Sequence, residues 1–166
     1  MRQVEVGFCL SKKDTEPGIT QGDIVKKFGF DYRPVVMERL KHWGKLPDDH
    51  TLNFFSVAEF HKGSSGLYLL EEKIGDSWIF VQAMFGKGIS TKHKHGENVV
   101  ELYDPLAGQS LLNVDGIDQE LNPGVPFEVL PGQVHRLRTE EKPSLNLLIM
   151  KNSAHIPRNQ LHIPVA

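Results

Sequence analysis

The stretch Thr91 to Gly108, TKHKHGENVVELYDPLAG, contains two histidines separated by a single residue, followed by a glutamate. Side chains alternate between the two faces of an extended strand, so His93 and His95 project from the same face and can bind one divalent metal ion together. A third histidine, His135, ends the run PGQVH and comes close to them if both segments belong to one small barrel. With Glu101 as an oxygen ligand, the sequence predicts a metal site made of three imidazoles and one carboxylate.

This ligand set suits several metals. Three nitrogen ligands and one oxygen ligand leave two octahedral positions open for a substrate or water, and Fe(II), Mn(II), Ni(II), Co(II) and Zn(II) all accept them. We therefore expect one divalent transition metal and do not predict which. Two alternatives stay open: the histidines can belong to ordinary strands that bind no metal, and Glu101 can be a solvent-facing strand residue. Glu97 competes with Glu101 for the role of the acidic ligand.

Most of the chain has the pattern of an all-β protein. Fifteen glycines and ten prolines lie between short apolar runs, which indicates many turns and a sandwich or barrel. Gly75-Asp76 and Asp115-Gly116 are expected hairpin turns, because glycine and aspartate tolerate positive φ. The expected strands are residues 51–60, 66–74, 77–85, 89–95, 99–106, 109–114, 117–121, 126–130, 133–139 and 145–151.

The first fifty residues are expected to be mainly helical, after a short strand at residues 4–10. Thr20 can cap a helix that Gly29 ends, and a second helix is expected over residues 34–43. The predicted organisation is a helical N-terminal extension (1–50), a β-barrel (51–153) and an extended C-terminal tail (154–166). The proline-containing tail is expected to lie along a barrel edge or to reach a neighbouring subunit.

Length and charge restrict the class of protein. The 166 residues suffice for about one domain, and 19 basic against 21 acidic residues, without a basic block, make nucleic acid an unexpected partner. No apolar run approaches the ~20 residues of a membrane span, and the N-terminus lacks the apolar region of a signal peptide, so we expect a cytoplasmic protein. The single cysteine, Cys9, excludes an internal disulfide and is expected to be a small hydrophobic residue near a strand.

The metal-site stretch resembles the first motif of the cupin superfamily, which is a glycine, five residues, His-x-His, three or four residues, a glutamate, six residues and a glycine. The matching positions are His93, His95, Glu101 and Gly108. Two features depart from the motif. Five residues separate His95 from Glu101, and Gly86 and Gly88 straddle the place of the leading glycine.

A later segment resembles the second cupin motif, which is a glycine, five residues, Pro-x-Gly, two residues, a histidine, three residues and an asparagine. The matching positions are Gly124, Gly132 and His135. Leu130 replaces the proline and Thr139 stands in the place of the asparagine. Both motifs together cover residues 86–139, about a third of the chain. The resemblance implies a cupin double-stranded β-helix (a jelly-roll barrel) that carries a short helical extension.

Strand alternation predicts which side chains line the barrel interior. With the metal ligands inward, their alternate neighbours also point inward, and Gln82 shares a face with three apolar residues of its strand. The predicted substrate pocket consists of Thr91, Gln82, Trp78, Phe80, Met84 and Leu137. Tyr103 points to the same side as Glu101 and is either a packed aromatic residue or an acid-base group. The remaining histidines, His42, His50, His61, His155 and His162, are expected to be structural.

Cupins include isomerases, epimerases, decarboxylases, oxygenases and non-catalytic binders, so the fold does not imply the reaction. The run from Thr91 to His95, with Glu101, Tyr103 and Gly108, is similar to the metal-site segment of the archaeal cupin-type glucose-6-phosphate isomerases. This similarity favours an isomerase or epimerase of a sugar or sugar derivative in which Glu101 or Tyr103 moves a proton. The alternatives are a non-haem iron dioxygenase, which a dry aromatic pocket would favour, and a non-catalytic small-ligand binder. Many cupins are dimers, so a homodimer is compatible with the resemblance.

Overall fold

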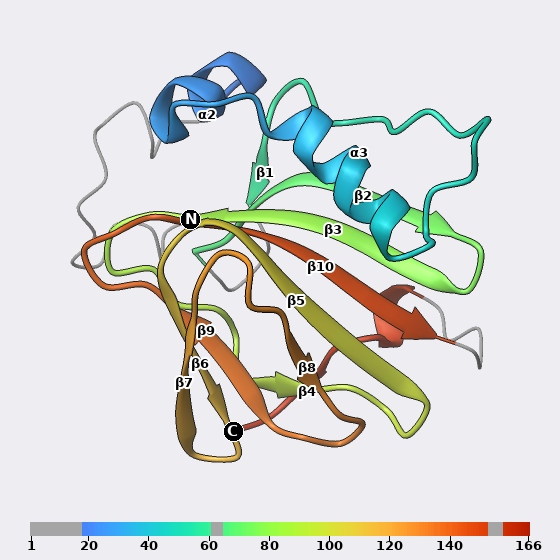
Figure 1. Ribbon diagram of the computed structural model, residues 1–166. Coiled ribbons are helices and arrows are strands. Elements are labelled where there is room, and N and C mark those ends of the chain that lie inside the picture. The colour runs from blue at the N-terminus through green and yellow to red at the C-terminus, as the bar shows by residue number, and fades with distance from the viewer. Residues whose placement is uncertain (1–17, 61–64, 153–157) are drawn as a thin grey trace.

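The computed structural model describes residues 18–60, 65–152 and 158–166, and in it two antiparallel β-sheets pack face to face, with two helices outside one of them (Figure 1). The predicted strand at residues 4–10, Cys9, His61 and His155 lie outside the described residues. The helices are α2 (Gln21–Phe28) and α3 (Tyr32–His42), and a short 3₁₀ helix, η2, spans Arg158–Gln160. The described residues contain no helix long and apolar enough to cross a membrane.

The larger sheet has six strands and the smaller has five. In spatial order the larger sheet consists of β1 (Glu59–Phe60), β2 (Leu67–Ile74), β3 (Ser77–Met84), β10 (Ser144–Asn152), β5 (Val99–Gly108) and β8 (Phe127–Val129). The smaller consists of β11 (Ile163–Pro164), β4 (His93–Lys94), β9 (His135–Arg138), β6 (Ser110–Val114) and β7 (Ile117–Leu121).

Local turn and capping signals produce the structures that the sequence predicts. Asp115 and Gly116, with φ angles of 49° and 86°, form the hairpin between β6 and β7. The Thr20 hydroxyl accepts a hydrogen bond from the Asp23 amide (3.2 Å), and the Asp23 carboxylate accepts one from the Thr20 amide (2.9 Å). This capping box begins α2, and Gly29, with φ 81°, ends it.

The second helix begins earlier than predicted. It starts at Tyr32 rather than Pro34, because the Asp31 carboxylate accepts a hydrogen bond from the Arg33 amide (3.0 Å) and caps the helix. Two predicted strands are shorter than expected. Only Glu59–Phe60 and His93–Lys94 are strands within residues 51–60 and 89–95, because the preceding residues make isolated contacts, such as the bridge between Thr20 and Val57, instead of a continuous ladder.

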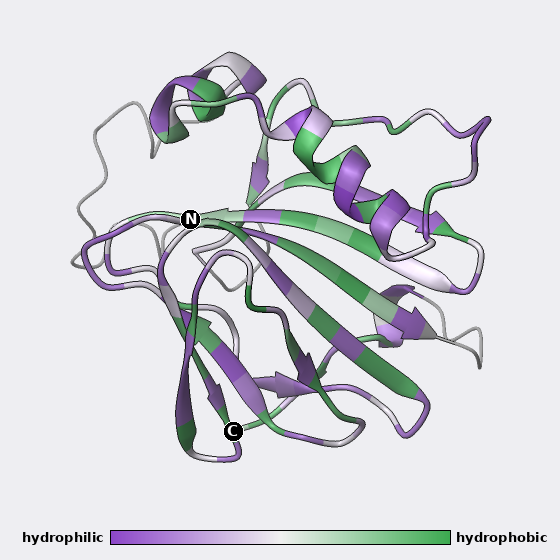
Figure 2. Ribbon diagram, in the orientation of Figure 1, coloured by the Kyte–Doolittle hydropathy of each residue, from purple (hydrophilic) through white to green (hydrophobic). Residues whose placement is uncertain are grey.

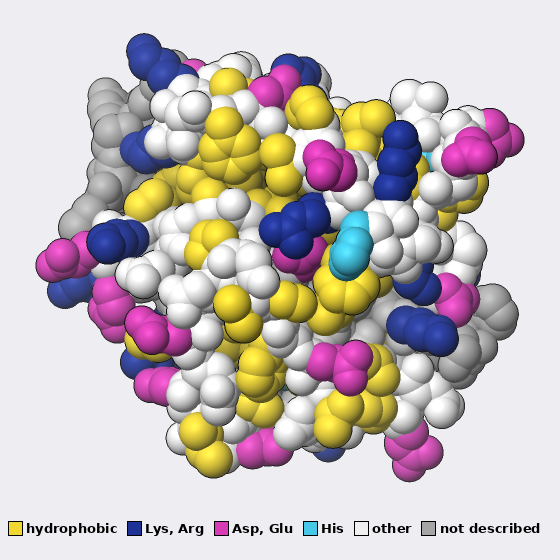
Figure 3. All heavy atoms as spheres, viewed as in Figure 1, with side chains coloured by type: hydrophobic (Ala, Val, Ile, Leu, Met, Phe, Trp, Pro, Cys, Tyr) yellow, Lys and Arg dark blue, Asp and Glu magenta, His cyan; other side chains and the backbone are white. Residues whose placement is uncertain are grey.

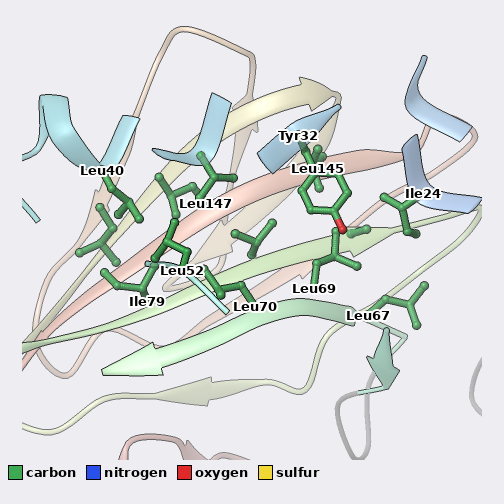
Figure 4. Close-up of a cluster of buried hydrophobic side chains, with 14 of the residues drawn as sticks. Ile24, Tyr32, Leu40, Leu52, Leu67, Leu69, Leu70, Ile79, Leu145 and Leu147 are labelled. Carbon is green, nitrogen blue, oxygen red and sulfur yellow. The ribbon is translucent and has the colours of Figure 1, made fainter. Parts of the chain in front are cut away.

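Two hydrophobic clusters hold the three layers together. One lies between the helices and the outer face of the larger sheet, where Ile24, Tyr32 and Leu40 face side chains such as Leu69 and Leu145 (Figure 4). The other lies between the two sheets. The strands β3 and β10 supply side chains to both clusters, which explains their long hydrophobic runs (Figure 2).

Helix α3 is also anchored to the barrel through a buried carboxylate. Asp104 of β5 is fully buried and accepts hydrogen bonds from Nη1 of Arg39 (3.1 Å) and Nε1 of Trp43 (2.8 Å). Elsewhere on the face shown in Figure 3, acidic and basic side chains are interspersed. Asp104 therefore joins the helical layer to the sheet that carries Glu101.

Replacing Asp104 by alanine is expected to lower the free energy of unfolding by about 3 kcal/mol, because removal of one partner leaves the other groups of a buried pair unpaired. Urea denaturation measures the change. The matched control is Asp76→Ala, which removes a more exposed ion pair with Lys45 (3.3 Å) and should cost less than about 1 kcal/mol. Equal effects of the two substitutions would contradict the anchoring role of Asp104.

Candidate metal centre

Four buried side chains meet between the two sheets. The ligand atoms of His93, His95, Glu101 and His135 all lie within 4.8 Å of one another. His93 and His135 are directly paired residues of β4 and β9 in the smaller sheet, and Glu101 reaches them from β5 of the larger sheet. The fold thus brings the two halves of the predicted site together, and these four residues can hold a metal ion.

Each imidazole is held by a backbone carbonyl on the side away from the cluster. Nδ1 of His93 donates a hydrogen bond to the carbonyl of Thr91 (2.6 Å), and Nδ1 of His135 donates one to that of Gln133 (2.9 Å). Nδ1 of His95 donates to the carbonyl of Leu161 (2.7 Å). Because a carbonyl only accepts, Nδ1 carries the proton in all three rings, and in a neutral ring the lone pair of Nε2 is available to a metal.

The inward-facing atoms fit a bound cation. Nε2 of His95 and Nε2 of His135 lie 3.1 and 3.0 Å from the same carboxylate oxygen of Glu101. Nε2 of His93 is buried and has no hydrogen-bond partner among the described residues. Buried acceptors that face one another need a positive charge between them, supplied either by protons on the rings or by a metal ion. Three imidazole nitrogens and one carboxylate oxygen are ligands that divalent transition metals accept.

The protonation of the ligands follows from burial and from their contacts. Burial lowers the pKa of His93 to about 4, so its ring is neutral at neutral pH, as metal ligation requires. Burial also acts to lower the pKa of His95, but the charge and hydrogen bond of Glu101 outweigh it and raise the pKa. Burial acts to raise the pKa of Glu101, but His95 and His135 hold it well below its usual value. The carboxylate is therefore ionised.

The structure distinguishes between the two candidate acidic ligands. Glu101 is buried within the cluster, whereas Glu97 is exposed. The long gap before Glu101 is accommodated in the turn at residues 96–98, where the Val99 amide donates a hydrogen bond to the carbonyl of Gly96 (3.2 Å). An additional residue in this turn leaves the alternation of β5 unchanged, so Glu101 still points inward.

Thr139, in the place of the motif asparagine, joins β9 to the loop that leads to β4. Its buried hydroxyl donates a hydrogen bond to the carbonyl of Gly86 (2.7 Å) and accepts one from the amide of Gly88 (3.1 Å). A Cβ atom at Gly88 would lie 3.0 Å from this hydroxyl and 2.9 Å from the Met84 side chain. The close approach explains the need for glycine at residue 88.

A cavity of about 140 Å³ adjoins the four ligands. Besides His93 and Glu101, it is lined by Tyr68, Gln82, Ser90, Thr91, Tyr103, Leu148, His162 and Pro164. Two predicted pocket residues, Gln82 and Thr91, lie along it. The other four, Trp78, Phe80, Met84 and Leu137, are in or against the hydrophobic cluster between the sheets and do not line the cavity. Strand alternation identifies the face of a side chain but not its position along the barrel axis.

Tyr103 lies in this cavity beside Glu101. Its side chain is buried, and burial, followed by the charge of Glu101 and a hydrogen bond with it, raises the pKa of the hydroxyl well above the usual value. The hydroxyl is therefore protonated at neutral pH and can donate a hydrogen bond to Glu101 or to a molecule in the cavity.

Five lining residues are absent from the predicted site: Tyr68, Ser90, Leu148, His162 and Pro164. Tyr68 pairs with Gln82 across β2 and β3, so a correct strand pairing would have found it. His162 was expected to be structural, and no local signal distinguishes it from the other histidines. It lies near the site because β11 pairs with β4, and burial lowers its pKa to about 2.

The fold is the cupin fold, as the sequence motifs predict. The described chain is similar to the polyketide cyclase RemF from Streptomyces resistomycificus (15% identity over 69% of this chain and 89% of that chain, TM-score 0.52). It is also similar to an RmlC-like cupin from Shewanella frigidimarina (15% identity over 64% and 95% of the two chains, TM-score 0.52).

A third similar structure is the DMSP lyase DddQ from Ruegeria pomeroyi (22% identity over 57% of this chain, TM-score 0.48). The present chain covers about half of its length, 49%. No protein-family model and no curated protein matches the sequence.

Proposed function

We propose that this protein is a metal-dependent isomerase or epimerase that acts on a small, uncharged sugar or sugar derivative. The observation that carries the proposal is the position of Tyr103, whose hydroxyl lies beside the carboxylate of Glu101 in a cavity that adjoins the four ligands. An acid-base group next to a metal-binding carboxylate suits proton transfer at a carbon beside a carbonyl group.

The cavity wall supports an uncharged substrate. Tyr68, Gln82, Ser90 and Thr91 supply hydroxyl and amide groups that can exchange hydrogen bonds with substrate hydroxyls. The described lining contains neither lysine nor arginine, the side chains that usually bind a phosphate. The lining therefore favours a free sugar over a sugar phosphate.

The cavity volume restricts the size of the bound group. At about 140 Å³ it is comparable to the ~150 Å³ cavities in proteins that hold a benzene-sized molecule. A reacting group of about six non-hydrogen atoms fits this space, which corresponds to a short sugar or to one end of a longer open-chain sugar.

The metal ligands, the acid-base groups and the other cavity residues have separate roles in the proposed reaction. A divalent metal held by His93, His95, Glu101 and His135 would polarise a carbonyl or hydroxyl group of the substrate. The ionised carboxylate of Glu101 would accept the proton that leaves the carbon beside the carbonyl, while the hydroxyl of Tyr103 would donate its proton to the substrate oxygen. The hydrogen bond between the two side chains would then return the proton from Glu101 to Tyr103. Gln82 and Thr91, which also line the cavity, would orient the substrate by hydrogen bonds.

Deuterium incorporation tests the proposed reaction. Protein loaded with Mn(II), Fe(II), Co(II), Ni(II) or Zn(II) is incubated in D₂O with uncharged aldoses and ketoses of three to six carbons, and NMR follows the products. We expect interconversion of one such pair, with deuterium appearing at the carbon beside the carbonyl and no oxygen uptake. Oxygen consumption by the Fe(II) protein without deuterium incorporation would support a dioxygenase instead, and saturable sugar binding without turnover would support a non-catalytic binder.

A further inference from the structure

The C-terminal segment 161–166 lies along β4, the strand that carries His93 and ends one residue before His95 (Figure 1). In β11, Ile163 pairs with Lys94 and Pro164 pairs with His93. The Val165 amide continues this contact by donating a hydrogen bond to the carbonyl of Lys92 (3.1 Å). The segment is thus the edge of the smaller sheet, next to the candidate metal centre.

Leu161 supports the metal site through its backbone. His93 and His135 are each held by the carbonyl of the residue two positions earlier, so their support is local. His95 is held by the carbonyl of Leu161, which is 66 residues away in sequence (2.7 Å). The Leu161 side chain is fully buried and keeps this carbonyl in place. The orientation and tautomer of His95 therefore depend on the docking of the C-terminal segment.

His162 supports the same histidines through ring contacts. Its ring centroid lies 4.7 Å from that of His93 and 5.1 Å from that of His95. The Phe80 ring contacts it edge-on at 6.4 Å. His162 is outside the group of four converging ligands, but it lines the adjoining cavity. Its ring restricts the positions that the rings of His93 and His95 can take.

We propose that the segment Leu161–Ala166 completes the metal centre, with the Leu161 carbonyl and the His162 ring as positioning groups for His95 and His93. High metal affinity then requires the C-terminus to be docked on β4. This inference rests on the metal site of the proposed function. It adds a role in metal binding for the C-terminal segment, which supplies none of the four ligands.

Removal of the segment tests the contribution of Leu161. Full-length protein and a chain that ends at Gln160 are titrated with Co(II), and visible absorption reports both affinity and coordination geometry. We expect the shorter chain to bind Co(II) roughly 10- to 100-fold more weakly, as is typical when groups that support a ligand are lost, with an altered spectrum. The matched control in the full-length chain is His42→Ala, an exposed histidine of α3, which should change neither property.

Two substitutions in the full-length chain test His162 without removing the segment. If the shorter chain fails to fold, these substitutions still test whether the segment supports metal binding. His162→Ala is expected to weaken Co(II) binding, whereas His162→Phe, which retains an aromatic ring, should restore most of the affinity. Equal loss in both variants would mean that an imidazole nitrogen is required, which overturns the positioning role.

The outcomes separate this inference from the proposed function. Unchanged affinity and spectra in both the shortened chain and His162→Ala would refute the inference while leaving the four-ligand site intact. Failure of the full-length protein to bind Co(II) would refute the metal site itself, and with it both proposals.

Discussion

Replacement of His93 or His135 by alanine is expected to reduce bound metal from close to one equivalent per chain to a trace. Each substitution removes one of only three imidazoles from a buried cluster whose remaining ligand is a single carboxylate. The loss cannot be compensated by His162 if that ring is a positioning group. Elemental analysis of the purified proteins measures the change, and circular dichroism shows whether each variant keeps its β structure. Full metal occupancy in both variants would contradict the site.

A pair of charge-removing substitutions provides the matched control. Glu101→Gln should weaken metal binding strongly, because the amide is a poor ligand and its nitrogen would face the imidazoles. Glu97→Gln should have little effect, because Glu97 is exposed. The reverse order would assign the carboxylate ligand to Glu97.

Metal removal should also change stability. A ligand that binds only the folded state adds about 2.7 kcal/mol to the free energy of unfolding at one hundred times its dissociation constant. A chelator is therefore expected to lower the melting temperature of the wild-type protein and to leave that of His93→Ala unchanged. A shift of equal size in the variant would show that the stabilising metal is bound elsewhere.

Replacement of Tyr103 by phenylalanine is expected to reduce turnover by roughly 10²- to 10⁴-fold, the usual contribution of a general acid or base. The phenyl ring retains the packing of Tyr103 in the cluster between the sheets, so metal content and melting temperature should change little. The measurement is the rate of deuterium incorporation by the metal-loaded protein on whichever sugar proves to be a substrate.

The control for Tyr103 is a second buried tyrosine. Tyr32→Phe removes a hydroxyl from the cluster between the helices and the larger sheet, outside the cavity, and should leave turnover unchanged. Unchanged turnover in Tyr103→Phe would contradict the acid-base role and indicate that Tyr103 is only a packed aromatic residue. Loss of metal together with turnover would show that Tyr103 acts by holding Glu101 in place.

Local interactions explain the parts of the structure that were predictable from sequence. Asp115 and Gly116 form their hairpin because positive φ angles are accessible to these two residues. The capping box at Thr20 uses groups only three residues apart. His93 and His95 share a face for the same kind of reason, since alternation along an extended chain needs no distant partner.

The sequence-based predictions were wrong where a strand or a pocket wall depended on a partner elsewhere in the chain. Residues 51–60 have the composition of a strand, but only Glu59 and Phe60 pair with β2. The apolar pocket wall was predicted from the correct face of β3, but Phe80 and Met84 fill the cluster between the sheets instead of the cavity. Periodicity describes which side of a strand faces inward, whereas the position of a cavity depends on the side chains of several strands at once.

By itself the sequence was sufficient to predict the cupin fold and the three converging histidines, because motif spacing and strand alternation are properties of short segments. The tertiary structure was needed to choose Glu101 over Glu97 and to place Leu161 and His162 against the metal-site histidines. His95 and Leu161 are 66 residues apart in sequence, so their contact was not predictable from either segment alone. A contact of that range depends on which strand edges pair, and no local pattern around either residue contains this information.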